Sequence, residues 1–151
     1  MAILLCLDDS FPNARMVDNG ITLFIAVDCG ITAIDQVEHA RGLNLDVIIC
    51  DHHEPSEVLP NAYAVLDPIK PGDKYPFKHL SGCGVGFKLI QAIAQRLNRE
   101  SLLPEYLDFV TLATTADIVP LAAFFFAALS PETIPALLQS SVKTWPQLNV
   151  P

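Results

Sequence analysis

Residues 46–55, Asp-Val-Ile-Ile-Cys-Asp-His-His-Glu-Pro, constrain the fold most, because a short apolar run ends there abruptly at polar residues. The apolar run predicts a buried strand of a parallel sheet, and Asp51, His52 and His53 follow directly after it. In open α/β sheets, ligands bind beyond the carboxyl ends of the strands, so these three side chains are candidates for a functional site. A polar turn with a satisfied histidine pair is the alternative, and it is favoured for an isolated pair.

A second predicted strand, at residues 22–27, also ends at a carboxylate, Asp28. Apolar residues then repeat at helical spacing over residues 33–40, and Thr32 is a candidate for the cap of this helix. Strand, helix and strand in this order predict a right-handed βαβ unit. Its two strand ends bring Asp28 and Asp51 to the same edge of the sheet, which favours a functional site.

Further strands are predicted at residues 3–7 and 62–66, the second ending at an Asp-Pro pair. Residues 69–80 are rich in proline and lysine and predict a surface loop. Helices are expected after residue 81 and from Pro104 onward. The predicted fold class is therefore α/β, with an open, mostly parallel sheet and flanking helices.

A glycine-rich segment, Ser-Gly-Cys-Gly-Val-Gly at residues 81–86, opens the first of these two helices. A glycine-rich turn at a helix N-terminus offers backbone N–H groups to an anion, which makes Gly82 and Gly84 candidates for binding a phosphate. Close packing is the commoner role of such spacing, and the poor strand before it disfavours a dinucleotide site. The expected apolar face of the helix is Val85, Leu89, Ile90, Ile93 and Leu97.

Asp117 follows the second helix, whose predicted stripe is Leu107, Val110, Thr111 and Thr114. A carboxylate in so apolar a segment is costly unless it is paired or bound to a metal, so Asp117 is also a candidate site residue.

Composition limits the class of protein. The 151 residues are 51% hydrophobic and 17% charged, which predicts a globular domain, and the net charge of −8 argues against a broad phosphate-binding surface. No apolar run is long enough to span a membrane, and the N-terminus lacks the features of a signal peptide. We therefore expect a cytoplasmic protein without a membrane partner. Its scattered cysteines are expected to be reduced thiols: Cys6, Cys29, Cys50 and Cys83.

Four segments, at residues 27–31, 50–53, 80–88 and 113–121, resemble in order the motifs of the DHH phosphoesterases. The resemblance is strongest to the RecJ-type exonucleases, which degrade single-stranded DNA from its 5′ end. The related manganese pyrophosphatases and oligonucleotide phosphodiesterases share the aspartates and Asp-His-His but match the last two segments less well.

The resemblance implies hydrolysis of a phosphodiester with two Mn²⁺ or Mg²⁺ ions and single-stranded DNA as the partner. In this family Asp28 would bridge the two metals, while His52 and Asp117 would complete the shell of the second metal. His53 would face the substrate phosphate, and Asp51 would orient the imidazoles.

The sequence also departs from the family. The first motif, D-x-D-G, is expected well upstream of Asp28 and is missing, although Asp8 and Asp9 follow an apolar run. Residues 1–121 are therefore expected to form a partial DHH domain, an internal fragment that is inactive or impaired. Residues 122–151 are expected to be an unrelated apolar segment and tail.

Two alternative functions remain open at this point. One is a non-catalytic remnant that binds a metal or a partner, and the other is a small-molecule phosphohydrolase such as a pyrophosphatase. His39 and His79 match no motif and are expected to be surface residues. The sequence gives no indication of the oligomeric state.

Overall fold

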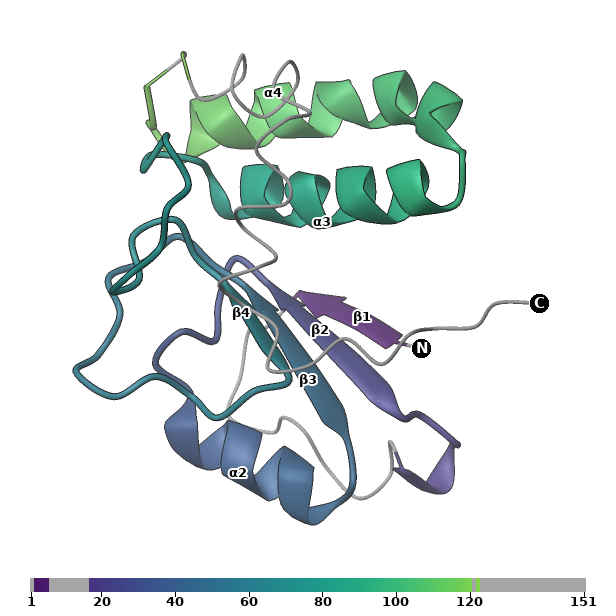
Figure 1. The fold of residues 1–151 in the computed structure, drawn as a ribbon, viewed down its shortest axis with the longest axis vertical. Helices are drawn as coiled ribbons and strands as arrows, with labels where there is room; N and C mark the ends of the chain where they lie inside the picture. Colours follow the sequence, from purple (N-terminus) through teal and green to yellow (C-terminus); the bar gives the residue numbers. More distant parts are fainter. Residues whose placement is uncertain (1, 6–16, 121, 123–151) are drawn as a thin grey trace.

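The computed structural model describes residues 2–5, 17–120 and 122 of the chain (Figure 1). Within these residues, four strands and three α-helices are joined by loops and by one 3₁₀-helix, η1. In chain order the elements are β1 (Ala2–Leu5), β2 (Leu23–Val27), α2 (Ile34–Gly42), β3 (Asp46–Cys50), β4 (Ala64–Leu66), α3 (Gly82–Arg96), η1 (Glu100–Tyr106) and α4 (Leu107–Ala116).

The strands form one sheet in the order β1-β2-β3-β4, and every neighbouring pair is parallel. Val27 pairs with Cys50, and Cys50 pairs with Leu66, so β2, β3 and β4 end at the same level. Figure 1 shows α2 on one face of the sheet and α3 on the other, with α4 stacked on the outer side of α3. The α/β fold class with an open parallel sheet and flanking helices is confirmed.

Alternation along the strands explains why both faces are covered, because successive strand residues point to opposite sides. Phe24 and Ile49 pack with Val37 of α2, whereas Ile25 packs with Val85 of α3. The predicted helix and strand of the βαβ unit are confirmed as α2 and β3, with small changes at their ends.

The start of α2 differs from the prediction. Thr32 was the expected cap, but the N-cap is Ala33, which makes no side-chain cap hydrogen bond. The turn before α2 is instead stabilised by a residue at the edge of the sheet, because the Ile31 N–H donates a hydrogen bond to Asp51 Oδ2 at 2.9 Å.

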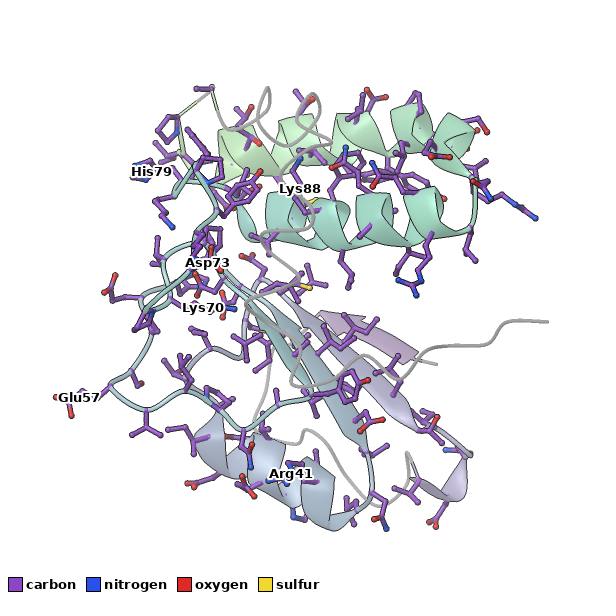
Figure 2. All side chains as sticks on the ribbon, in the orientation of Figure 1. Arg41, Glu57, Lys70, Asp73, His79 and Lys88 are labelled. Carbon is purple, nitrogen blue, oxygen red and sulfur yellow. The ribbon has the colours of Figure 1, made fainter. Side chains whose placement is uncertain are left out.

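The loop between β4 and α3 is exposed over much of its length, as its proline and lysine content predicts, but it also buries two large side chains (Figure 2). Tyr75 is fully buried, and Lys70 is buried as well, with its Nζ donating to the Val65 carbonyl oxygen. The Asp73 carboxylate contacts both residues, because it lies 3.7 Å from Lys70 Nζ and accepts a hydrogen bond from the Tyr75 N–H at 2.7 Å. It also lies 3.9 Å from Lys78 Nζ. Charge pairing thus folds the loop back onto the sheet edge.

Helix α3 buries a different face from the one expected. Val85 is buried as predicted, but Ile90, Ile93 and Leu97 are 42%, 47% and 55% exposed. Lys88 is buried in their place, between α3 and α4 (Figure 2). The glycines at the start of α3 determine how the helix lies on the sheet, as described below, and hydrophobic periodicity does not capture that contact.

Helix α4 begins at Leu107, after η1, which contains the predicted helix start Pro104. Val110 and Thr114 are buried as predicted, whereas Thr111 is exposed. The Thr114 hydroxyl donates to the Val110 carbonyl oxygen at 2.7 Å, which satisfies the buried hydroxyl.

Several minor predictions are also resolved. His39 and His79 are exposed, as expected. The described cysteines Cys29, Cys50 and Cys83 are free thiols, and burial raises the pKa of Cys50 to about 12. No described helix has the length and apolar character needed to cross a membrane.

The predictions for Asp8, Asp9, Cys6 and the apolar segment after residue 121 concern residues outside the described part of the chain.

Candidate metal centre

Backbone hydrogen bonds extend the sheet by one residue beyond its strands and so place the candidate side chains. The Asp28 N–H donates to the Cys50 carbonyl oxygen at 2.8 Å, and the Asp51 N–H donates to the Leu66 carbonyl oxygen at 2.9 Å. Asp28 and Asp51 therefore stand side by side at the carboxyl edge of the sheet, as the βαβ argument predicts.

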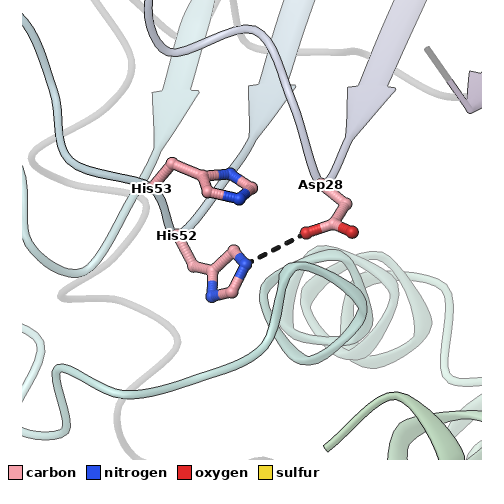
Figure 3. A group of neighbouring side chains, drawn as sticks. All are labelled: Asp28, His52 and His53. Carbon is pink, nitrogen blue, oxygen red and sulfur yellow. Dashed lines mark ion pairs between the residues drawn. The ribbon is translucent and has the colours of Figure 1, made fainter. Parts of the chain in front are cut away.

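Asp28 adopts a left-handed backbone conformation, with φ of 66°. Non-glycine residues rarely adopt this region, although aspartate tolerates it better than most. The Asp28 Oδ1 atom is buried and accepts no hydrogen bond from a described residue, and His52 Nε2 lies 3.1 Å away (Figure 3). Burial and then the nearby Asp117 raise the pKa of Asp28, while His52 and His53 oppose the rise.

Asp117, at the C-terminal end of α4, also lies near His52. Its Oδ2 atom lies 3.9 Å from His52 Nε2. The apolar setting expected for Asp117 is not found, because its side chain is 27% exposed and the residue as a whole is exposed. The structure nevertheless brings Asp28, His52 and Asp117 together, although they are far apart in sequence.

His53 belongs to the tightest cluster of potential metal ligands. Ligand atoms of Asp28, His52 and His53 all lie within 4.8 Å of one another, and the two histidine rings have centroids 4.5 Å apart. Figure 3 shows the carboxylate of Asp28 facing the imidazole of His52, with His53 beside it. His53 thus lies within the distance of a metal ligand from Asp28 and His52, whereas the resemblance to the DHH phosphoesterases implied contact with the substrate phosphate.

Asp51 is the buried anchor of the two histidines. Its carboxylate accepts hydrogen bonds from the N–H groups of Ile31, His52 and His53, and Oδ1 lies 2.7 Å from His53 Nδ1. Burial alone would raise the pKa of Asp51, but these hydrogen bonds outweigh it and lower the pKa. The hydrogen bond to Asp51 is in turn the main cause that raises the pKa of His53.

The glycines of α3 allow the helix to touch the metal-binding edge. A Cβ atom at Gly82 would lie 2.1 Å from Asp28 Oδ1, and one at Gly86 would lie 3.2 Å from Val27 Cγ1. Ser81 caps the helix by accepting a hydrogen bond from the Gly84 N–H at 3.1 Å. Gly82 and Gly84 therefore have packing and capping roles, and their contact with a phosphate stays a prediction.

Asp67 is a candidate that the sequence analysis missed. It follows β4 as Asp28 and Asp51 follow β2 and β3, and that shared position was the available signal. Asp67 is 0% exposed, and burial is the main cause that raises its pKa to about 6.

The residues of this edge fit a divalent cation. Mn²⁺ accepts both imidazole and carboxylate ligands, and Mg²⁺ prefers oxygen. The Asp28 Oδ1 atom is the specific observation, because it is a buried carboxylate oxygen without a hydrogen-bond donor among the described residues. A cation would satisfy this oxygen and would remove the repulsion between Asp28 and Asp117.

Residues 2–114 of the chain match the DHH family, N-terminal domain. The chain belongs to the DHH family. The prediction from the four ordered segments is confirmed, and Asp51, His52 and His53 are the Asp-His-His run that the resemblance rested on.

Curated relatives of this DHH chain carry the name single-stranded-DNA-specific exonuclease RecJ. The protein from Bacillus subtilis is 46% identical over 104 residues, which cover 69% of this chain and 13% of the relative. The protein from Escherichia coli is 40% identical over 114 residues, covering 69% of this chain and 20% of the relative. The chain thus spans a fifth or less of the length of these two relatives.

Two solved structures of RecJ share this fold. Exonuclease RecJ bound to manganese superposes with a TM-score of 0.60 and 31% identity, over 83% of this chain and 33% of that chain. RecJ in complex with Mn²⁺ from Thermus thermophilus also gives a TM-score of 0.60, with 32% identity, over 77% of this chain and 18% of that chain.

Proposed function

We propose that this chain carries part of the catalytic core of a RecJ-type exonuclease, which hydrolyses phosphodiester bonds of single-stranded DNA from the 5′ end with Mn²⁺ or Mg²⁺. The names of the relatives and the manganese in the two RecJ structures support this proposal. We place the catalytic part in residues 1–121 and treat residues 122–151 as a separate segment. A cytoplasmic location is part of the same proposal.

The observation that carries the proposal is the convergence on His52 Nε2. Asp28 Oδ1 lies 3.1 Å from this nitrogen, Asp117 Oδ2 lies 3.9 Å from it, and Asp28 Oδ1 lacks a hydrogen-bond donor among the described residues. Asp28, His52 and Asp117 would hold the cation. When bound, Mn²⁺ or Mg²⁺ lowers the pKa of a water molecule and neutralises charge that develops on the phosphoryl oxygens.

The other residues would serve the substrate. Asp51 holds the His53 ring through Nδ1, and the His53 side chain is 59% exposed and accessible to a phosphate. The hydrogen bond to Asp51 raises the pKa of His53 and so favours the protonated ring, which donates to a phosphate oxygen. Backbone N–H groups at the start of α3, near Gly82 and Gly84, would complete the anion site, apart from the Gly84 N–H, which donates to Ser81 Oγ.

Titration calorimetry with Mn²⁺ tests the metal centre. Binding heat should be present in the parent chain and should disappear in His52→Ala. His39→Ala is the matched control, because His39 is an exposed histidine on α2, away from the sheet edge. Equal binding by His52→Ala and His39→Ala would refute the assignment.

Hydrolysis assays with Mn²⁺ test the substrate. The proposal expects any activity to favour 5′-phosphorylated single-stranded DNA over pyrophosphate and over a dinucleotide, and to be lost in Asp28→Ala. Asp46→Ala is the control, since Asp46 is exposed at the opposite end of β3. Preference for pyrophosphate or the dinucleotide would favour a small-molecule phosphohydrolase. Metal binding without hydrolysis of any substrate would favour the non-catalytic alternative.

A further inference from the structure

The loop that joins β4 to α3 lies beside the candidate metal centre at both of its ends (Figure 1). At one end, the Leu66 carbonyl oxygen accepts a hydrogen bond from the Asp51 N–H at 2.9 Å. At the other end, Gly82 lies so close to Asp28 that a Cβ atom at Gly82 would be 2.6 Å from the Asp28 Cα atom. Residues 67–81 therefore begin and end at the carboxyl edge of the sheet.

Buried contacts fix the conformation of this loop. Lys78 Nζ donates hydrogen bonds to the carbonyl oxygens of Pro68 at 2.7 Å and Asp73 at 3.0 Å, and so joins two points of the loop. The Asp73 side chain is 0% exposed, and its carboxylate lies 3.7 Å from Lys70 Nζ. Asp73 is the one acidic residue in the sequence from 68 to 80, so the negative charge of the loop is buried and paired.

The outer surface of the loop carries cations instead. Lys74 is exposed, and the Lys78 side chain is 40% exposed although its Nζ atom contacts the loop backbone. Residues 68–80 contain three lysines and one aspartate, whereas the whole chain has a net charge of −8. Because an acidic chain needs a local excess of positive charge to bind phosphate groups, this loop is suited to an anionic partner.

His79 places an aromatic ring beside these cations. It is exposed, and its ring lies edge-to-face with the ring of Phe77, with centroids 5.7 Å apart and an angle of 81° between the planes. Phe77 packs against the core cluster that includes Val85 of α3, so the His79 ring rests on a supported neighbour. Perpendicular rings leave at least one face of His79 uncovered by Phe77. Figure 2 shows His79 projecting outward near the start of α3.

Chain geometry limits the distance between His79 and the metal centre. Gly82 follows His79 by three residues, and three residues span at most about 11 Å. Gly82 in turn lies against Asp28. A DNA strand with one phosphate at the metal centre therefore has its neighbouring nucleotides within reach of His79.

We propose that this loop is a binding surface for single-stranded DNA, in which a base stacks on the His79 ring and Lys74 binds a backbone phosphate. Proteins that bind single strands without reading their sequence combine aromatic rings with positive charge in this way. The inference rests on the proposed function and names residues that hold the strand beside the site of hydrolysis. The surface is narrow, which agrees with the acidic net charge of the chain.

Nitrogen-15 NMR with a short oligothymidylate tests the surface. Mg²⁺ fills the metal centre, and phosphorothioate linkages keep the oligonucleotide intact. Signals of residues 74–79 should move on its addition. His79→Ala should weaken binding at least about 5-fold through loss of stacking, whereas His79→Phe, which keeps a ring, should bind like the parent. His39→Ala is the matched control, because it removes an exposed histidine from α2 on the opposite face of the sheet.

The salt dependence of binding tests Lys74 separately. Lys74→Ala should reduce the slope of log affinity against log salt by about 0.7, the value for one phosphate contact on a single strand. Lys74→Arg should restore the slope, and Arg41→Ala, which removes an exposed cation from α2, should leave it unchanged. An oligonucleotide of the same length without bases should keep the dependence on Lys74 and lose the dependence on His79.

Equal binding of the oligonucleotide by His79→Ala and His39→Ala would overturn the inference, and so would loop signals that do not move. The proposed function is judged apart from this result, by hydrolysis of unmodified DNA. A parent chain that degrades DNA while binding is independent of His79 would keep the function and reject the surface. Binding that depends on His79 in a chain that degrades no DNA would keep the surface and reject the function.

Discussion

At the scale of single residues, the position of Asp28 requires a residue without a Cβ atom at position 82. The left-handed backbone of Asp28 puts its carboxylate against the first turn of α3, where a Cβ atom at Gly82 would lie 2.6 Å from Asp28 Cα. Contacts this short to backbone cannot be relieved by turning a side chain. The glycine is therefore required by the position of a candidate metal ligand.

Gly82→Ala should destabilise the fold by roughly 1–3 kcal/mol through overpacking, and it should weaken Mn²⁺ binding by displacing Asp28. Gly42→Ala is the control, because nothing lies within 4 Å of a Cβ atom there and the helix favours alanine by about 0.5–1 kcal/mol. Urea unfolding and Mn²⁺ calorimetry on both variants measure these effects. A stable Gly82→Ala chain with unchanged affinity would contradict the close contact.

Asp67 should give the stability of the fold a specific dependence on pH. Its pKa is raised from 3.8 to about 6, so the folded chain binds the proton more tightly than the unfolded chain. The stabilisation is fully present below pH 3.8 and is lost as the pH rises through 6. The difference of about 2 pKa units corresponds to at most about 3 kcal/mol.

Asp67→Asn should remove this dependence, because an amide does not titrate. The free energy of unfolding of the variant relative to the parent should therefore increase by about 2–3 kcal/mol between pH 4 and pH 7. Urea unfolding at several pH values measures it. A difference between variant and parent that does not change with pH would show that Asp67 is not buried as a charged group.

At the scale of elements, the sequence predicts what depends on local pattern. Short apolar runs that end at polar residues identify β2, β3 and β4, and helical spacing identifies α2 and α4. The buried face of α3 was not predictable in this way, because the backbone contact at Gly82 determines how the helix lies on the sheet. The burial of Lys70 and Tyr75 was missed because both contact Asp73, Lys70 through an ion pair and Tyr75 through its backbone N–H, and these contacts form only in the folded loop.

The packing of α4 on α3 can be tested with two neighbouring residues. Val110 is 1% exposed in the core shared with α3, whereas Leu112 is 69% exposed. Val110→Ala should lower the free energy of unfolding by about 2 kcal/mol, since it removes buried methyl groups and leaves a cavity. Leu112→Ala should change it by less than about 0.5 kcal/mol. Thermal unfolding of both variants measures the difference. Equal losses of stability in Val110→Ala and Leu112→Ala would contradict this arrangement of α4.

At the scale of the whole molecule, the candidate site draws on three distant parts of the chain. The convergence of Asp28 with His52 was predictable from the βαβ rule, because both follow adjacent parallel strands. The position of Asp117 beside His52 was expected only from the resemblance to the DHH phosphoesterases, because hydrophobic periodicity does not predict that the end of α4 lies at the carboxyl edge of the sheet. Asp67 was missed, because an Asp-Pro pair after a strand also suits an ordinary turn.

The isolated chain should degrade single-stranded DNA poorly. Among the described residues, one group of three potential ligands lies close enough to hold a cation, whereas a two-metal mechanism needs two cations about 3.5–4 Å apart. Each metal ion supplies several kcal/mol of transition-state stabilisation. Because each 1.36 kcal/mol of activation free energy is tenfold in rate, a chain with one cation should be at least about 1,000-fold slower than an enzyme with two.

Degradation of 5′-phosphorylated single-stranded DNA with Mn²⁺ measures this rate, with Asp28→Ala as the background. Robust 5′-to-3′ degradation that Asp28→Ala abolishes would contradict the prediction. Asp8 and Asp9 would then be the next residues to replace, as candidate ligands of a second cation.

The distribution of the ligands along the chain also bears on the order in which the molecule assembles. Asp28 and His52 meet within one βαβ unit, whose loop closure is short, whereas Asp117 joins them only after α3 and α4 have docked. A partly folded chain would therefore present an incomplete coordination sphere. Tight binding of the cation would then be a late event in folding, and the metal would stabilise docked helices rather than nucleate the sheet.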